Sequence, residues 1–266
     1  GDGTNEKAMI GYLLDNLLGA SSTSAQIDAT GNYDHRLILG TTKEYLTLEE
    51  TLLRTANDRR IEGCRVTEVV IRWNGAEGAL TYSCTLTGRI PTDVTAQSLT
   101  DYTGDPHRGW EAQVNFAGTG SFARLLSAEW TLRRSVRPFY AGQNIQNFTD
   151  LYLGPLEVTC SMVLDYSVTT DLASVRSKTQ AEVSNLFRIG TENMASERTF
   201  AIGGNTVDLG DGPAELDTTE EHVKLGIVGR SLYSTSNGPF SSSSNAATAQ
   251  NGPVQVQIIQ PIVAAH

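Results

Sequence analysis

Three stretches of this chain alternate apolar residues with small polar ones almost without error: residues 80–87, 126–133 and 156–166. Successive side chains of a β-strand point to opposite faces of its sheet, so each stretch is predicted to be a strand with one apolar and one polar face. The apolar face is ordinary core, and the polar face is the best functional clue in the sequence. It is formed by Thr81, Ser83, Thr85, Thr87, Ser127, Glu129, Thr131, Glu157, Thr159, Ser161 and Asp165.

The remaining patterns predict a mainly β fold, an antiparallel β-sandwich or barrel with a flanking α-helix. Further strands are predicted near residues 36–40, 66–73, 112–117, 199–203, 205–209, 222–232 and 254–263. Helical spacing is present at residues 5–18 and 171–186, and Thr47 with Glu50 forms a capping box that predicts a short helix to about residue 56.

The predicted organisation is an N-terminal helix and polar arm over residues 1–34, followed by a β-sandwich domain over residues 35–266. Two long polar loops interrupt this domain, at residues 89–111 and 233–252. Loops of this length within a compact domain are usually functional or disordered. Both are therefore predicted to be contact arms, although for the second a decorative outer loop is an equal alternative.

The net charge of −10 argues against a protein that grips nucleic acid by neutralising phosphates. It is compatible with a surface that repels a polyanion and lets it slide. No run of about 18 apolar residues predicts a membrane span. Cys64, Cys84 and Cys160 match no zinc motif, and buried free thiols are favoured over a disulfide.

Patterns typical of catalysis or metal binding are weak. None of the four histidines has a partner at metal-ligand spacing. The glycine pairs at 203–204 and at 210 and 212 lack the lysine and helix of a phosphate-binding loop, so they are interpreted as hairpin turns. The acidic run over residues 208–221 fits no calcium loop, and a solvated acidic loop is favoured over a calcium site. We therefore expect no catalytic residue, cofactor or metal.

Three segments have a recognisable pattern. The first is a hairpin, Arg60-Ile-Glu-Gly-Cys-Arg-Val-Thr-Glu-Val-Val-Ile-Arg-Trp73, a glycine turn, and Ala79-Leu-Thr-Tyr-Ser-Cys-Thr-Leu-Thr-Gly88. The others are Ser127-Ala-Glu-Trp-Thr-Leu-Arg-Arg-Ser-Val136 and Leu153-Gly-Pro-Leu-Glu-Val-Thr-Cys160. These segments, and the order of the elements, resemble the tail tube proteins of long-tailed bacteriophages, and the resemblance covers roughly residues 35–263.

The resemblance implies a non-enzymatic virion protein, assembled in the host cytoplasm. Six β-sandwich subunits would form a ring, and stacked rings would form the tube through which the genome is delivered. The implied partners are further copies of the chain, the tail terminator, tape measure and distal tail proteins, and double-stranded DNA in transient, non-specific passage.

Within this interpretation the polar face lines an electronegative lumen, where hydroxyls keep the wall wet and carboxylates repel phosphate. Arg133 departs from the pattern and is expected to be neutralised by Glu129 or Glu157. The expected inter-subunit contacts are Arg89, Arg108 and Trp110, because Arg and Trp are over-represented at binding hot spots.

Other interpretations stay open. A one-sided sheet that simply faces solvent also has a polar face. The chain could be another virion part, such as a tail terminator or a capsid decoration protein. A ligand-binding β-sandwich is disfavoured, because Trp73, Trp130 and Tyr82 fall on apolar strand faces rather than on a groove.

Overall fold

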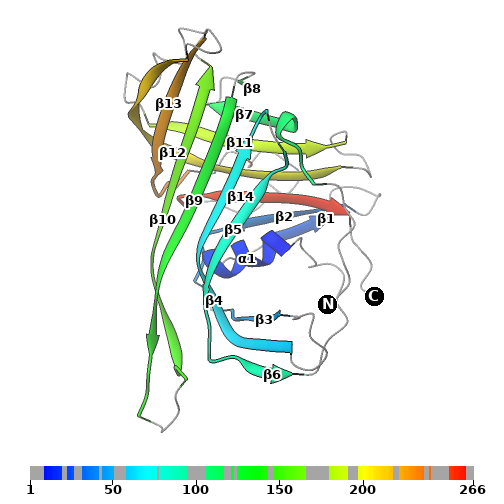
Figure 1. Cartoon of the computed structure of the whole chain (residues 1–266), viewed down its shortest axis with the longest axis vertical. Helices are drawn as coiled ribbons and strands as arrows, with labels where there is room; N and C mark the ends of the chain where they lie inside the picture. Colours follow the sequence, from blue (N-terminus) through cyan, green and yellow to red (C-terminus); the bar gives the residue numbers. More distant parts are fainter. Residues whose placement is uncertain are drawn as a thin grey trace.

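The fold, a computed structural model, is mainly β and antiparallel, as the sequence predicts, and its described residues include one short N-terminal α-helix (Figure 1). The structure describes residues 9–19, 23–26, 32–41, 44–50, 58–76, 78–94, 106–116, 121–122, 125–142, 147–165, 180–190, 197–217, 222–236, 240 and 252–261. Its elements are α1 (Met9–Leu18), β1 (Thr23–Gln26), β2 (Asn32–Ile38), β3 (Leu46–Glu50), β4 (Asp58–Asn74), β5 (Thr81–Thr87), β6 (Thr92–Val94), the 3-10 turn η1 (Gly109–Glu111), β7 (Ala112–Phe116), β8 (Ser121–Phe122), β9 (Leu125–Phe139), β10 (Asp150–Asp165), β11 (Ala181–Ile189), β12 (Arg198–Asp217), β13 (His222–Ser231) and β14 (Gln255–Pro261).

The first layer consists of β5, β4, β9, β10, β13 and the C-terminal half of β12, in that order. In Figure 1 these strands run along the long axis of the molecule. Their apolar faces are in register: Ile71 lies opposite Trp130, which lies opposite Cys160, and each of the three is at most 2% exposed. The alternation in the sequence therefore corresponds to a real core face.

The second layer contains β1, β2, β14, the N-terminal half of β12, β11 and β7, and its strands cross those of the first layer in Figure 1. Its apolar face packs on the first layer. Phe187 on β11, for example, meets Trp73 on β4 edge to face, with 5.9 Å between ring centroids. The core thus lies between the two layers.

The two layers are joined by β12, which changes layer near Gly203 and Gly204. A Cβ on Gly203 would lie 2.6 Å from Cβ of Ser184, and one on Gly204 would lie 3.1 Å from the carbonyl oxygen of Pro253. Glycine is thus required by close backbone approach at a sheet corner. The predicted hairpin turn at these glycines is wrong, and the predicted strands 199–203 and 205–209 belong to one long strand.

The predicted turn at Gly210 and Gly212 is also wrong, because both glycines lie within β12. They sit beside an irregularity in the pairing of β12 with β13, between Asp211 and Ala214. Glycine in a strand interior commonly marks a bulge of this kind.

The helix α1 packs against β4 and β2, and its C-terminus is held by a side chain from β9. Nη1 of Arg134 donates to the carbonyl oxygens of Leu17, at 3.2 Å, and Leu18, at 2.9 Å. A cation is favourable there, because the last carbonyls of a helix lack partners and carry partial negative charge. Gly19, at φ +63°, ends the helix, as the sequence predicts.

Two predicted helices are wrong where the structure describes them. Residues 47–50 of the capping box belong to β3, where an ion pair of 2.6 Å joins Glu49 to Arg60 of β4. Residues 181–186 belong to β11, which pairs with both β12 and β7. Pairing within a sheet overrides local helical spacing in short segments. Residues 51–57 and 171–179 lie outside the described part.

Both predicted long loops contain ordered pairings. Within residues 89–111, β6 pairs with β4, and η1 follows a bridge between Ala79 and Arg108. Within residues 233–252, Ser234 pairs with Gly252. Residues 95–105, 237–239 and 241–251 lie outside the described part.

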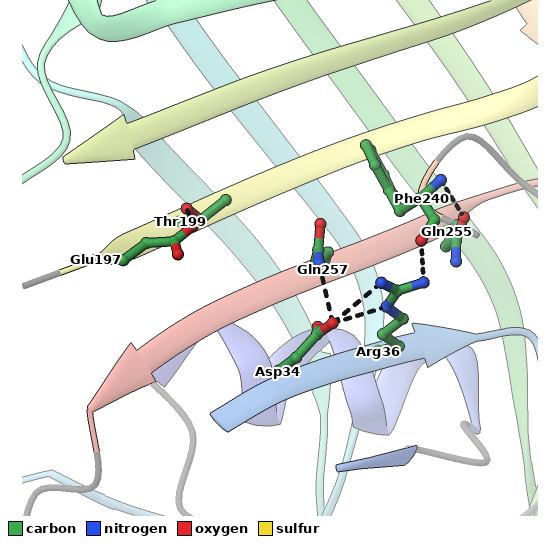
Figure 2. A network of polar contacts seen from close by, with 7 residues as sticks. All are labelled: Asp34, Arg36, Glu197, Thr199, Phe240, Gln255 and Gln257. Carbon is green, nitrogen blue, oxygen red and sulfur yellow. Dashed lines mark hydrogen bonds and ion pairs between the residues drawn. The ribbon is translucent and has the colours of Figure 1, made fainter. Parts of the chain in front are cut away.

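The outer face of the second layer is polar and buried (Figure 2). Nε and Nη2 of Arg36 each lie 3.0 Å from Oδ2 of Asp34, and Nε2 of Gln257 donates to the same oxygen, also at 3.0 Å. Arg36 also donates to the carbonyl oxygen of Phe240, whose N–H donates to Oε1 of Gln255 at 3.1 Å. Hydrogen bonds therefore join both the carbonyl oxygen and the N–H of Phe240 to side chains of the second layer.

Candidate functional site

All of the predicted polar-face residues lie on the outer face of the first layer. Strands β5, β9 and β10 contribute them, and none is buried. Thr159 lies opposite Thr131, and Ser161 lies opposite Glu129, so the residues of neighbouring strands form rows across the sheet. We call this surface, with its neighbours on β4 and β13, the polar face.

Strand β4 lies between β5 and β9 and adds charged side chains that the sequence analysis missed. Glu68 lies opposite both Thr85 and Arg133, and Arg72 lies opposite both Thr81 and Glu129. An irregularity between Val66 and Glu68 shifts the alternation of this strand relative to β5. The simple alternation of residues 69–74 was the signal that could have found Arg72.

Arg72 and Arg133 each form an ion pair on the polar face, and neither pair is the predicted one. Nε of Arg72 lies 2.6 Å from Oε2 of Glu129, and Nε of Arg133 lies 3.9 Å from Oε2 of Glu68. The expectation that Glu129 or Glu157 neutralises Arg133 is therefore corrected, although Glu157 lies opposite Arg133 on β10. Glu129 forms its ion pair with Arg72, which lies directly opposite it on β4.

The face is mixed in charge rather than uniformly acidic. Strand β13 brings Arg230 beside Thr159 and opposite Asp208, and it brings Lys224 opposite Asp165. Most of the basic side chains thus stand next to a carboxylate. A polyanion meets hydroxyls and locally compensated charges on this surface, rather than a field of one sign.

A hollow of about 620 Å³ opens on the polar face near the turn between β4 and β5. Its polar lining includes Arg72, Asn74, Thr81, Ser127, Glu129 and Ser161. Among the described residues, no group of three or more His, Cys, Asp or Glu side chains is placed to hold a metal ion. The walls of the hollow are those of the sheet surface itself.

The three predicted inter-subunit residues lie at opposite ends of the first layer. The guanidinium carbon of Arg89 lies 5.7 Å from the ring centroid of Phe148, near the tip of the β9–β10 hairpin. The same atom of Arg108 lies 5.0 Å from the Trp110 ring at η1, beside the β4–β5 turn, and Trp110 is 68% exposed. The structure therefore does not bring Arg89 together with the other two.

The first layer ends in two open edges. Among the described residues, β5 pairs only with β4, and the C-terminal half of β12 beyond Val207 pairs only with β13. Tyr82 is on the apolar face of β5, as predicted, but is 39% exposed because its strand is at an edge. Open edges carry backbone donors and acceptors that invite another strand.

The three cysteines are free thiols, and two of them, Cys64 and Cys160, are buried. Desolvation raises the pKa of Cys160 to about 12, which keeps this thiol protonated and unreactive. No helix in the described part is long and apolar enough to cross a membrane.

Comparison with known proteins identifies the family of this chain. The sequence matches the phage tail tube protein family over residues 2–256, which is nearly the whole chain. No curated protein matches it significantly. The family is structural and non-enzymatic, and its members are part of the virion tail. The chain belongs to the phage tail tube protein family.

Proposed function

We propose that copies of this chain pair edge to edge into rings, six-membered as the family resemblance implies, that stack into the tail tube. The polar face then lines the lumen through which double-stranded DNA passes into the host. The observation that carries this proposal is that the first layer has two unpaired edge strands, β5 on one side and the C-terminal half of β12 on the other. The tail terminator, tape measure and distal tail proteins are the proposed partners of the assembled tube.

The two open edges are different strands, so their pairing is head to tail. If β5 of one copy adds to the C-terminal half of β12 in the next, the contact repeats around a ring and closes when the rotation is complete. Ring closure then turns the first layers into one continuous barrel and leaves no strand edge of the first layer exposed. The described part of β5 contains no proline that would block such pairing.

The position of the second layer supports an arrangement in which the polar face turns inward. It covers only the apolar side of the first layer, so a ring with the second layer inside would crowd it towards the axis. With the second layer outside, the polar face alone borders the lumen. The face then presents hydroxyls and carboxylates to passing DNA.

This wall is suited to passage rather than to binding. A protein that neutralises phosphates with basic side chains gains affinity through counterion release, and a moving duplex would have to break each contact. Arg72 and Arg133 stand against Glu129 and Glu68, so their charge is compensated locally. The lumen therefore retains water without holding the polyanion.

Blocking the β5 edge tests the ring. The carbonyl oxygen of Thr85 accepts from the Thr67 hydroxyl of β4 at 3.1 Å, so the backbone groups of the preceding residue, Cys84, face the open edge. Cys84→Pro removes that edge N–H, whereas Cys84→Ala keeps it and serves as the matched control. Negative-stain microscopy of the parent and of Cys84→Ala is expected to show rings or tubes, and a Cys84→Pro protein with an unchanged circular dichroism spectrum is expected to show monomers. A folded Cys84→Pro protein that still forms rings would contradict pairing through β5.

A further inference from the structure

Five large apolar side chains gather, exposed, at the end of the molecule where the β9–β10 hairpin turns. We call them the arm patch: Tyr45, Ile90, Phe139, Tyr140 and Tyr152, which are 45%, 49%, 46%, 61% and 53% exposed. They are five of the eleven large hydrophobic side chains that are exposed in the described part of the chain. A concentration of exposed apolar side chains in one place marks an interaction site, whereas single exposed apolar side chains are ordinary.

Specific contacts join Phe139 to Tyr152 and fix Tyr45 and Ile90 to the β9–β10 hairpin. Phe139 and Tyr152 meet edge to face at 5.8 Å, and the hydroxyl of Tyr45 donates to Oδ1 of Asp150 at 2.8 Å. A second link is the N–H of Ile90, which donates to the side-chain oxygen of Asn147 at 3.0 Å. A surface ordered in advance loses little conformational freedom on binding.

The support under the patch is the long hairpin itself. In Figure 1, β9 and β10 continue past the second layer to the lower end of the molecule, where their turn lies. The guanidinium of Arg89 over the ring of Phe148 ties this turn back to the segment that follows β5. The patch is therefore a projecting but braced surface.

The opposite end of the same layer carries an exposed Arg–Trp pair. Trp110 is 68% exposed, with the Arg108 guanidinium carbon 5.0 Å from its ring centroid. The N–H of Arg108 donates to Oε2 of Glu111 at 2.8 Å, and the N–H of Gly109 donates to the carbonyl oxygen of Gly78 at 3.0 Å. These bonds fix η1 to the β4–β5 turn, so this surface is also ordered in advance.

We infer that the arm patch of one copy binds the Arg108–Trp110 surface of another copy in the adjacent ring. This inference rests on the proposed function and names the surfaces that stack one ring on the next. The two surfaces are chemically matched, since tyrosine and tryptophan rings stack on each other and attract a guanidinium. They lie at opposite ends of the same strands, as a contact repeated along a tube axis requires.

Variants at the two surfaces separate stacking from ring formation. We would compare Tyr140→Ser with Tyr152→Ser in one chain, Trp110→Ser in a second, and all three changes in a third. Val228→Ser is the control, because Val228 is 56% exposed in the middle of β13 and belongs to neither surface nor to a predicted contact arm. The readouts are electron microscopy and sedimentation over a range of protein concentrations.

The variants at either surface are expected to form single rings, with the concentration needed for tubes raised at least about tenfold, as loss of a hot spot implies. The triple variant is expected to be little worse than either, because both sets of changes break one contact. Val228→Ser is expected to form tubes like the parent. Additive losses in the triple variant would show that the two surfaces do not meet.

Other outcomes overturn the inference in distinguishable ways. Variants that form normal tubes but fail to join other tail components would assign the arm patch to the tube ends. Folded variants that remain monomeric would assign it to the contact within a ring. A parent protein that forms neither rings nor tubes would overturn the proposed function itself.

Discussion

The two layers of this protein both have polar outer faces, yet the two faces differ in how deeply their charged side chains are buried. On the first layer, Arg72 and Glu129 form an ion pair while 57% and 41% exposed. On the second layer, Asp34 and Arg36 form an ion pair while each is 1% exposed, and Arg36 also donates to the carbonyl oxygen of Phe240. Exposed pairs contribute about 0–1 kcal/mol to stability, whereas losing one partner of a buried pair costs about 3–5 kcal/mol. The first face is available for contact, and the second is part of the fold.

The largest expected effect comes from breaking the buried pair. Asp34→Ala leaves the Arg36 guanidinium in the interior without its carboxylate, so the free energy of unfolding should fall by about 3–5 kcal/mol. Glu129→Ala on the first layer is the matched control and should lower it by at most about 1 kcal/mol. Urea unfolding measures both. Equal losses would abolish the distinction between the two faces.

The next effect concerns Phe240. Gln255→Leu removes the oxygen that accepts the Phe240 N–H, and a hydrogen bond of this kind contributes about 0.5–1.5 kcal/mol. Hydrogen exchange at the Phe240 amide should therefore speed up by about tenfold in this variant. Ser161→Ala, on the polar face, is the control and should leave that exchange rate unchanged. Exchange that is equally fast in the parent would show that the hydrogen bond from Phe240 to Gln255 does not protect this amide.

A pH dependence is expected where the two layers meet. The ring centroids of His107 and of Phe187 in the second layer lie 6.5 Å apart. The backbone carbonyl oxygen of His107 accepts a hydrogen bond from the N–H of Leu80, beside β5. Desolvation lowers the pKa of His107, with an opposing influence from Glu111 and a supporting one from Arg198. The unfolded chain therefore binds this proton more readily than the folded one.

It follows that the free energy of unfolding should fall as pH drops below about 6.5, and level off for this group below its folded pKa. The contribution is fully present above pH 6.5. Urea unfolding from pH 8 to pH 5 would measure it, with His107→Gln as the reference that lacks the slope. A variant with the same slope as the parent would remove His107 from this account.

The smallest effect on stability is expected for charge reversal on the polar face. Glu157→Lys and Asp165→Lys should each lower the free energy of unfolding by at most about 1 kcal/mol, because each places a lysine opposite a basic residue, Arg133 or Lys224, on a solvated face. In virions the same changes should slow genome ejection, most clearly at low salt, where screening is weakest. Ejection at the parental rate at low salt would count against a luminal position.

The sequence predicts one side of this comparison much better than the other. Strict alternation is enough to place Thr81, Thr131 and Thr159 on one face, because strand geometry is local. The buried face depends on Arg36 meeting Phe240, which lies 204 residues away in the sequence. No local pattern contains that contact.

The wrong predictions have related physical causes. The capping box at Thr47 and Glu50 and the helical spacing of residues 181–186 are local signals that pairing in a sheet outweighs. Gly203 and Gly204 have the composition of a turn, but they serve a corner where Ser184 and Pro253 approach the backbone. The basic partners on the polar face were missed because the neighbours of a strand are set by topology, not by its own sequence.

The most direct test of the central claim is a cryo-electron microscopy reconstruction of the assembled tube. We expect the first layers of neighbouring subunits to form one continuous barrel, joined through β5, with Thr81, Thr131 and Thr159 facing the lumen. The second layer and α1 should lie outside that barrel. A map in which these threonines face the outer surface, or lie buried between subunits, would contradict the account.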